Sequence, residues 1–229
     1  MSPTMVTYKS QEYVSTSGVP EGSNLGPLLF ILFIDGLLRS LSCHALTYAD
    51  DLKIYSRISC VNDVNYLQHN LNKIVLWTLR NKLKLNTDKC RTVPYTRKKH
   101  SVPSSYKIND VPLSKETIIK DLGVLFDTNM TFVNHIESIA SAASKTLGFI
   151  MRTAKLFHSP LVLKSLYFSF ALSKLEFASN VWSPYYICHQ LVVEKIQRRF
   201  LKFLSVKIAG SYPPRGTDYN LLLDTHNLE

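Results

Sequence analysis

The sequence predicts an α+β protein in which short strands and two helices come first and a run of helices follows. Up to about residue 127, β-prone segments alternate with turn residues and with two apolar periodic stretches. From Phe132 onward the apolar residues recur at helical spacing, and Pro160 and Pro184 divide this part. We therefore expect two domains, residues 1–127 and 128–229, with the boundary at the change in composition near residue 128.

The first helix is expected soon after a turn-rich stretch. Residues 5–16 are β-prone and lead into the glycines and proline of residues 18–22. Ser23 or Asn24 can cap the following helix, and Pro27 suits its first turn because an N–H lost there has no intrahelical partner. The residues after Pro27 are apolar on most sides, so we expect this helix to be buried under a sheet.

A second helix is expected from Asn62 or Asp63 to about Arg80, because apolar residues recur there every three or four positions. Trp77 is one of these positions, and we assign it to the core rather than to base stacking. Further short strands are expected at residues 83–96, 106–108 and 118–126, followed by helices at residues 132–157, 160–180 and 188–206.

The charge balance favours a polyanionic partner. The 229 residues are 45% apolar, enough for a core, and carry a net charge of +10. Eight Lys or Arg and a single acid lie within residues 80–99. Binding to nucleic acid through such residues would weaken steeply with salt, although a solvated loop is an equal alternative for Arg97, Lys98 and Lys99.

A second set of cations lies in the last long helix. Lys195, Arg198, Arg199 and Lys202 recur at three- and four-residue spacing, which predicts one cationic helical face. It is either a phosphate-tracking face or an ordinary solvated one. The opposite, buried stripe is expected to consist of Val192, Ile196, Phe200 and Leu204.

Several classes of protein are disfavoured. The four cysteines lie far apart with no Cys-x-x-Cys pair, which argues against a zinc module and does not require disulfides. The N-terminus lacks the pattern of a secretory signal, and the most apolar run is much shorter than the roughly 20 residues of a membrane helix. We therefore expect an intracellular protein with no membrane partner.

Two adjacent carboxylates stand between short β-prone stretches in the segment Tyr48-Ala49-Asp50-Asp51. This arrangement predicts a hairpin with the acids at its tip. A bend is needed because consecutive side chains of a strand point to opposite faces. Mg²⁺ is usually bound by one or two carboxylates together with substrate phosphates, so the motif favours phosphoryl-transfer chemistry. Taken alone, an Asp-Asp pair is more often a solvated turn or a helix cap.

Four other segments accompany this hairpin in a characteristic order. They are Gly-Val-Pro-Glu-Gly-Ser-Asn-Leu-Gly-Pro-Leu-Leu-Phe at residues 18–30, Leu-Lys-Leu-Asn-Thr-Asp-Lys-Cys at 83–90, Ile-Lys-Asp-Leu-Gly-Val at 119–124 and Leu-Glu-Phe-Ala-Ser-Asn-Val-Trp-Ser-Pro at 175–184. The five together resemble the reverse transcriptase of non-long-terminal-repeat (LINE-like) retrotransposons, most closely the jockey-type insect elements. The resemblance covers nearly the whole chain. It implies a partial polymerase palm, an antiparallel sheet with packed helices, followed by an all-helical thumb and extension.

The resemblance also implies the site. Asp50 and Asp51 would be catalytic and bind metal, with Mg²⁺ as the cofactor and two ions in the intact family site. Lys89 would act on the triphosphate as the third catalytic residue, and a solvated surface lysine is its alternative. The implied substrate-binding residues are Tyr48, Gly18, Pro20, Glu21, Gly22, Ser23, Leu122 and Gly123. The implied partners are an RNA template, a DNA primer and deoxynucleoside triphosphates, and the implied site of action is nuclear DNA.

Two departures from the family pattern bear on activity. Glu21 stands where the family usually has Gln, which adds a negative charge beside the nucleotide pocket. Reverse transcriptases also carry a metal-binding aspartate upstream of the Gly-Val-Pro segment, whereas Glu12 is the sole acid among the first seventeen residues. We therefore expect the fingers, the first aspartate strand and the endonuclease portion to be missing, and the isolated chain to be inactive. A non-catalytic nucleic-acid-binding remnant of a decayed element and an incomplete gene product are the alternatives.

Overall fold

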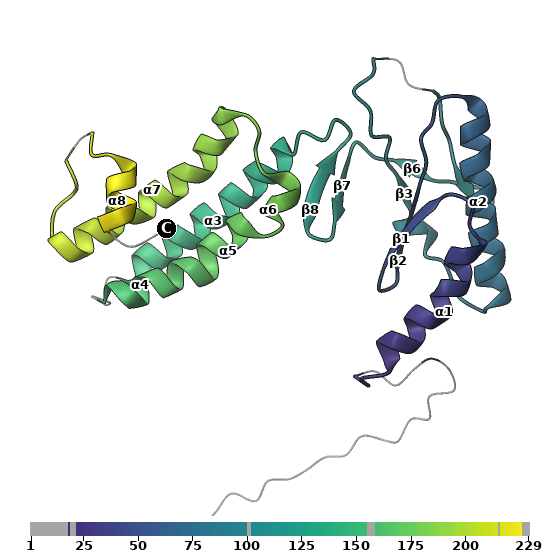
Figure 1. Ribbon diagram of the computed structural model, residues 1–229, viewed down its shortest axis with the longest axis horizontal. Helices are drawn as coiled ribbons and strands as arrows, with labels where there is room; N and C mark the ends of the chain where they lie inside the picture. Colours follow the sequence, from purple (N-terminus) through teal and green to yellow (C-terminus); the bar gives the residue numbers. More distant parts are fainter. Residues whose placement is uncertain (1–17, 19–21, 100–101, 155–158, 215, 226–229) are drawn as a thin grey trace, which may run out of the picture. The chain divides into compact units, whose positions relative to one another are not determined.

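The computed structural model describes residue 18 and residues 22–99, 102–154, 159–214 and 216–225 (Figure 1). The chain divides into two compact units. Unit 1 comprises residues 1–90 and 100–114, and unit 2 comprises residues 91–99 and 115–229. Helices and short strands are mixed along the chain, as expected for an α+β protein. The assignment of residues 1–127 and 128–229 as two domains stays a prediction.

Unit 1 contains two long helices and two small antiparallel hairpins. Its elements are α1 (Gly26–Ser40), β1 (His44–Tyr48), β2 (Asp51–Tyr55), α2 (Val61–Arg80), the 3-10 turn η1 (Thr87–Lys89), β4 (Lys107–Ile108) and β5 (Val111–Pro112). Strand β1 pairs only with β2, and β4 only with β5, among the residues described. The sheets of unit 1 are therefore separate two-stranded hairpins among the residues described, whereas the resemblance implied an antiparallel sheet with packed helices.

Helix α1 begins as the sequence predicts, with Pro27 in its first turn. Leu25 is the formal N-cap, and the Ser23 hydroxyl accepts a hydrogen bond from the Gly26 N–H at 3.0 Å, which partners one of the otherwise unpaired donors of the first turn. The expectation that α1 is buried is wrong for most of its surface. Leu37 is 2% exposed, but five large apolar residues remain open to solvent: Leu28, Leu29, Ile31, Leu32 and Phe33.

The contact that α1 makes with α2 explains this exposure. The Phe33 ring lies 5.2 Å from the Trp77 ring at a tilt of 59°, and Trp77 is half-buried as a packing residue of α2. The outward residues of α1 named above are exposed in the described part of unit 1. Periodicity predicted an apolar helix correctly, but it could not say which neighbours would be present to cover it.

Helix α2 starts at Val61, close to the predicted position, but its cap differs. The Asp63 carboxylate accepts hydrogen bonds from the backbone N–H groups of Ser59 at 2.7 Å and Cys60 at 3.0 Å. Asp63 is the third residue of the helix, and its carboxylate bonds to the backbone of the N-cap residue Cys60, as in a capping box. These hydrogen bonds lower the pKa of the Asp63 carboxyl, since they favour the charged form.

A buried amide joins α2 to the connection between α1 and β1. Asn70 has no exposed surface; its Oδ1 accepts from the Ser42 N–H at 2.8 Å and its Nδ2 donates to the Tyr66 carbonyl at 2.9 Å. The Tyr66 hydroxyl donates to the Ser42 carbonyl, and Lys73 Nζ lies 3.0 Å from Ser42 Oγ. Three side chains of α2 therefore hold Ser42, two residues before β1 begins.

A second polar tie holds β4. The Gln68 amide donates through Nε2 to the Lys107 carbonyl at 2.9 Å and accepts through Oε1 from the Lys107 N–H at 2.9 Å. Tyr106 and Ile108, on either side, are buried. The predicted strand at residues 106–108 is thereby confirmed at Lys107–Ile108. The strand predicted at residues 83–96 is mostly wrong, because η1 occupies Thr87–Lys89 and only β3 (Arg91–Thr92) is a strand.

Unit 2 combines a hairpin with a helical core. The hairpin is β7 (Ile118–Asp121) and β8 (Val124–Asp127), so the strand structure predicted at residues 118–126 is confirmed, and β3 pairs with β6 (Ser114–Lys115). The helical elements are α3 (Val133–Thr153), α4 (Pro160–Tyr167), the π-helical segment η3 (Phe168–Leu172), α5 (Ser173–Glu176), α6 (Ser179–Trp182), α7 (Ile187–Ala209) and α8 (Tyr219–Thr225). The helix predicted at 160–180 is thus interrupted, and α8 was not predicted.

The core of unit 2 lies between α3, α4 and α7. The rings of Tyr167 and Phe200 stack in parallel at 3.9 Å between centroids, and neither has exposed surface. Leu147, Leu163 and Leu204 are equally buried around them. Burial raises the pKa of the Tyr219 hydroxyl, on α8 beside this core, to about 12. Of the predicted apolar stripe of α7, Ile196, Phe200 and Leu204 are buried, but Val192 is exposed.

One carboxylate organises the passage from β8 to α3. Asp127 accepts hydrogen bonds from the backbone N–H groups of Asn129, Thr131 and Phe132 and from the Thr131 hydroxyl, at 2.7–3.1 Å. Burial works toward a higher pKa of the Asp127 carboxyl, but the hydrogen bonds outweigh it and the pKa is lowered. Asp127 therefore stabilises the fold in its ionised form.

No helix in the described residues is long and apolar enough to span a bilayer.

Replacing Asn70 by Ala is expected to lower the free energy of unfolding by about 1–3 kcal/mol, since it leaves the Ser42 N–H without its buried acceptor. Urea unfolding followed by far-UV circular dichroism measures this. Asn65→Ala is the matched control, because Asn65 is an exposed residue of the same helix. Equal midpoints for the two variants would contradict the assigned role of Asn70.

The stability of unit 2 is expected to fall in acid because of Asp127. Its lowered folded pKa means that the stabilisation is complete above the unfolded value of about 3.9 and disappears as the pH falls through the folded pKa. Asp127→Asn should be less stable than the parent at pH 7 and show a shallower loss between pH 5 and 2. Trp182 fluorescence in a Trp77→Phe background reports unit 2. The exposed Glu137→Gln serves as control, and an identical acid profile for the parent and Asp127→Asn would refute the assignment.

Candidate metal and nucleotide site

The Tyr48–Asp51 segment is a hairpin tip, as the sequence predicts. Strands β1 and β2 pair antiparallel from His44 opposite Tyr55 to Tyr48 opposite Asp51, which leaves Ala49 and Asp50 as a two-residue turn. Ala49 has a φ of 50°, the positive value that tight hairpin turns require. An alanine there is strained by roughly 1–2 kcal/mol, and such strain is common at functional sites.

The two carboxylates stand in water at this tip. Asp50 lies in the turn and Asp51 is the first residue of β2, and both are exposed. Tyr48, opposite Asp51 on the same face of the hairpin, is 64% exposed. The structure therefore brings together Tyr48, Asp50 and Asp51, three of the predicted site residues.

The Gly-Val-Pro segment is described only in part. Gly18 and Gly22 are exposed and have φ values of 90° and 77°, which explains the need for glycine at both turns. Ser23 serves the first turn of α1 through its bond to the Gly26 N–H. Pro20 and Glu21 lie outside the described residues.

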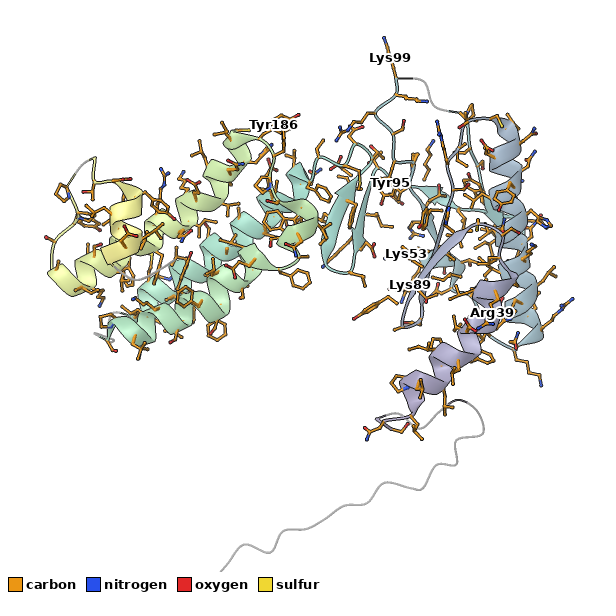
Figure 2. The ribbon with its side chains drawn as sticks, viewed as in Figure 1. Arg39, Lys53, Lys89, Tyr95, Lys99 and Tyr186 are labelled. Carbon is orange, nitrogen blue, oxygen red and sulfur yellow. The ribbon has the colours of Figure 1, made fainter. Side chains whose placement is uncertain are left out.

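Lys89 ends η1 in the same unit, and its side chain is exposed (Figure 2). Its backbone N–H donates to the Asn86 carbonyl at 3.2 Å. This hydrogen bond of the short 3-10 turn fixes the backbone position from which the Lys89 side chain extends. Lys89 forms no ion pair with Asp50 or Asp51 in the part of unit 1 that the structure describes. Its ammonium group is therefore open to solvent in the unit that carries the acidic tip.

Leu122 and Gly123 form the turn of the β7–β8 hairpin in unit 2. Their φ values are 43° and 93°, so both residues are left-handed, as in a type I′ turn. A methyl group built on Gly123 would lie 2.9 Å from Cε1 of Phe177. Phe177 was not predicted as a site residue, although it falls within the quoted segment 175–184; only the folded structure shows that it covers this turn.

The backbone of Phe177 is also held in place, by a hydrogen bond from a tryptophan side chain. Its carbonyl accepts a hydrogen bond from Trp182 Nε1 at 2.8 Å, and the Trp182 ring packs edge-on against His135 at 5.3 Å. His135 Nδ1 accepts in turn from the Leu125 N–H of β8 at 3.3 Å. Burial lowers the pKa of His135, which favours the neutral ring that this acceptor role requires.

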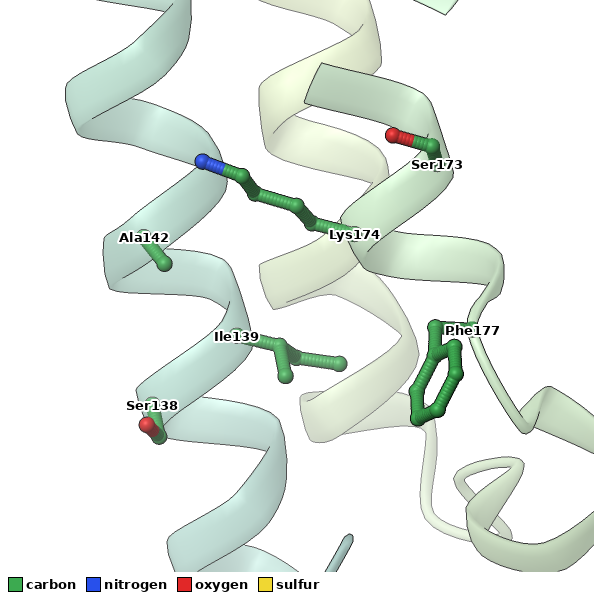
Figure 3. A pocket seen from close by; sticks show the side chains of 6 residues that line it. All are labelled: Ser138, Ile139, Ala142, Ser173, Lys174 and Phe177. Atoms are coloured by element: carbon green, nitrogen blue, oxygen red, sulfur yellow. The ribbon is translucent and has the colours of Figure 1, made fainter. Parts of the chain in front are cut away.

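Beside Phe177 lies an open pocket of about 450 Å³ between α3 and α5 (Figure 3). Its lining is mostly apolar, from Ile139, Ala142 and Phe177, with two serines at its margin. The Lys174 ammonium crosses it to donate to Thr146 Oγ1 at 2.6 Å. Lys174 is therefore engaged with α3, and the pocket has few of the convergent polar groups that mark a substrate site.

The oxygen donors at the hairpin tip suit a hard divalent cation. Asp50 and Asp51 provide adjacent carboxylates in contact with solvent, and Mg²⁺ completes such a pair with water and phosphate oxygens. Groups of three or more His, Cys, Asp or Glu side chains able to hold a metal are absent from the described residues. The tip therefore fits an ion that is shared with a nucleotide or with a further carboxylate.

The comparisons with known proteins give the class to which this α+β chain belongs. The family model for reverse transcriptase (RNA-dependent DNA polymerase) matches residues 3–156, well over half of the chain. The chain belongs to this family, as the five sequence segments indicated.

The curated relatives are mobile-element proteins. The chain is 34% identical over 137 residues to the probable RNA-directed DNA polymerase from transposon X-element of Drosophila melanogaster, covering 57% of this chain and 15% of that protein. It is 31% identical over 132 residues to the RNA-directed DNA polymerase from mobile element jockey of Drosophila funebris, covering 54% and 14%. The predicted likeness to jockey-type non-LTR elements is confirmed. No solved structure matches significantly.

Gly123→Ala is expected to destabilise unit 2 by about 1–2 kcal/mol, the cost of a left-handed alanine, with a further contribution from the Phe177 ring. In a Phe177→Ala background the ring contribution should vanish while the backbone cost persists, which a double-mutant cycle by urea unfolding resolves. If Gly123→Ala were neutral in the parent chain, residue 123 would not occupy a left-handed turn in solution.

Proposed function

We propose that this chain carries the aspartate hairpin of an RNA-directed DNA polymerase of a non-LTR retrotransposon. The observation that supports this most is the Tyr48–Asp51 tip, where the exposed carboxylates of Asp50, in a strained two-residue turn, and Asp51, directly after it, are adjacent in a chain of this family. The chain's match to the X-element relative covers 15% of that protein.

In this proposal each residue has one task. Asp50 and Asp51 bind metal, Tyr48 supports the primer terminus, and Lys89 neutralises or protonates the departing pyrophosphate. Two bound Mg²⁺ ions would supply Lewis-acid activation of the primer 3′-hydroxyl and stabilisation of the leaving group. Gly18, Gly22 and the 122–123 turn would leave room for nucleotide and primer close to the backbone.

The substrates follow from the same assignment. An RNA template would direct the addition of deoxynucleoside triphosphates to a DNA primer, at nuclear DNA. Because only two carboxylates come from the hairpin, we propose that the isolated chain does not extend a primer and needs a third carboxylate from elsewhere to hold two ions.

A non-catalytic nucleic-acid-binding remnant is the second candidate. The net charge of +10 and the exposed cations of residues 80–99 favour it, because they attract phosphate whether or not the acidic tip functions. The two candidates differ in one respect: only the polymerase site requires metal and triphosphate to bind together at Asp50 and Asp51.

Mn²⁺ titration with and without dTTP tests the polymerase site. We expect Mn²⁺ to broaden the backbone NMR signals of residues 47–53, and dTTP to tighten Mn²⁺ binding because the ion is shared with phosphate. Asp50→Asn with Asp51→Asn should abolish both effects, whereas Asp88→Asn, a solvent-exposed acid of the same unit, should not. Lys89→Gln should weaken dTTP about fivefold to tenfold while sparing Mn²⁺, as for one partly solvated charged contact.

Two outcomes would oppose the proposal. Mn²⁺ broadening that persists in the double Asp→Asn variant would place the ion elsewhere and leave the binding-remnant candidate. Primer extension by the isolated chain, abolished by Asp50→Ala, would confirm the polymerase site but refute the need for a third carboxylate.

A further inference from the structure

A series of contacts links the first turn of α3 to the turn of the β7–β8 hairpin, all within unit 2 (Figure 1). His135 of α3 accepts a hydrogen bond at Nδ1 from the Leu125 N–H of β8 at 3.3 Å. Its ring packs edge-on against Trp182 of α6 at 5.3 Å, and Trp182 Nε1 donates to the Phe177 carbonyl at 2.8 Å. The Phe177 ring lies so close to Gly123 that a methyl group there would clash with it. We call His135, Trp182 and Phe177 the His135 relay.

The contacts of His135 require a neutral ring. A nitrogen that accepts a hydrogen bond carries no proton, so the single proton of the neutral imidazole is on Nε2. Nε2 is buried and has no hydrogen-bond partner among the described residues. Buried polar atoms without a partner are rare in folded proteins and cost free energy. Stability alone therefore does not explain a histidine at this position.

A second proton on His135 would break the first contact of the relay. The imidazolium carries an N–H at Nδ1, so two donors would meet where the Leu125 N–H now finds an acceptor. The charge would also lie on a residue that is 2% exposed, in the first turn of a helix whose macrodipole repels cations. Burial accordingly lowers the pKa of His135.

No neighbouring charge stabilises the cation. The elements around His135 carry Lys120 (β7), Asp127 (β8), Glu137 (α3), Glu176 (α5) and Glu194 (α7), and α6 carries no charged residue. Lys120, Glu137 and Glu176 are exposed to solvent. Asp127 accepts from N–H groups at the start of α3, and Glu194 pairs with Arg198. The pKa of His135 is shifted by burial and by none of these groups.

We propose that the His135 relay is a proton-dependent latch on the Leu122–Gly123 turn. With a neutral ring the relay holds Phe177 against the turn, and protonation of the ring releases both. His135 is then a positioning residue, which acts on the turn through Trp182 and Phe177 without touching it. The latch does not rest on the proposed polymerase function, because unit 1 and its aspartates take no part in these contacts.

Amide hydrogen exchange of the full chain between pH 8 and 5 tests the latch. In the released state the ring regains its ordinary pKa of about 6.5, so a lower pH favours release until the folded pKa is reached. The protection factor of the Leu125 amide, corrected for intrinsic exchange, should therefore fall by about tenfold per pH unit below that value. The α-proton shifts of Gly123, which report the ring current of Phe177, should change over the same range.

Two variants of His135 separate the switch from packing. His135→Asn keeps an acceptor oxygen near the position of Nδ1 and cannot gain a proton, so the Leu125 amide should stay protected from pH 8 to 5. His135→Phe has no acceptor, so this protection should be lost at every pH. His189→Asn, which changes a half-buried histidine of the same unit, should keep the pH dependence of the parent chain.

A third variant tests the last contact of the relay. Phe177→Ala removes the ring but keeps the backbone carbonyl that binds Trp182 Nε1. The Leu125 amide should still lose protection as the pH falls, whereas the Gly123 shifts should no longer respond.

Three results would overturn the proposal. The first is a Leu125 protection factor that stays constant in the parent chain from pH 8 to 5. The second is the same pH dependence in the parent chain and in His135→Asn, which would assign it to another group. The third is a loss of Leu125 protection while the Gly123 shifts stay constant, which would mean that the relay does not reach the turn. None of these results depends on whether His135→Phe folds.

Discussion

The aspartate hairpin depends on a buried amide in α2. Strand β1 pairs with β2 alone among the described residues, and an isolated two-stranded hairpin is marginal in water. Asn70 compensates for this by holding Ser42 on the helix just before β1, with Tyr66 and Lys73 on the same backbone segment. Loss of the Asn70 contacts would leave the Ser42 N–H without an acceptor, which is costly. The segment that enters the hairpin is therefore held more firmly than pairing of the two strands alone would hold it.

The hairpin tip, unlike the buried anchor at Asn70, is exposed and strained. Ala49 adopts a left-handed conformation, and Asp50 and Asp51 repel each other with no ion pair from the described part of the chain to relieve them. Such a tip is stable only on a firm base, and it gains from anything positive that binds there. In a chain with a net charge of +10 this local acidity is distinctive, and it complements a phosphate-bound cation rather than a phosphate directly.

Local signals predicted the elements that are confirmed. Helix α2 followed from apolar periodicity, Pro27 marked the start of α1, and the β-prone residues 118–126 indicated the strands of the β7–β8 hairpin. Long-range features were beyond such reasoning. Neither the exposure of α1, nor the π-helical interruption at Phe168–Leu172, nor the approach of Phe177 to Gly123 has a local signature, because each depends on which distant segment packs there. Asn70 was equally hidden, as a buried amide resembles any polar helix residue until its partner 28 residues away is known.

Hydrogen exchange at the Ser42 amide tests most directly whether α2 fixes the hairpin that bears Asp50 and Asp51. Its N–H donates to the fully buried Asn70 side chain, so it should exchange as slowly as the central amides of α2, although Ser42 lies in a surface connection. Exchange at the rate of the exposed Ala49 amide at the tip would show that the anchor is open in solution and that α2 does not hold the aspartate hairpin in place.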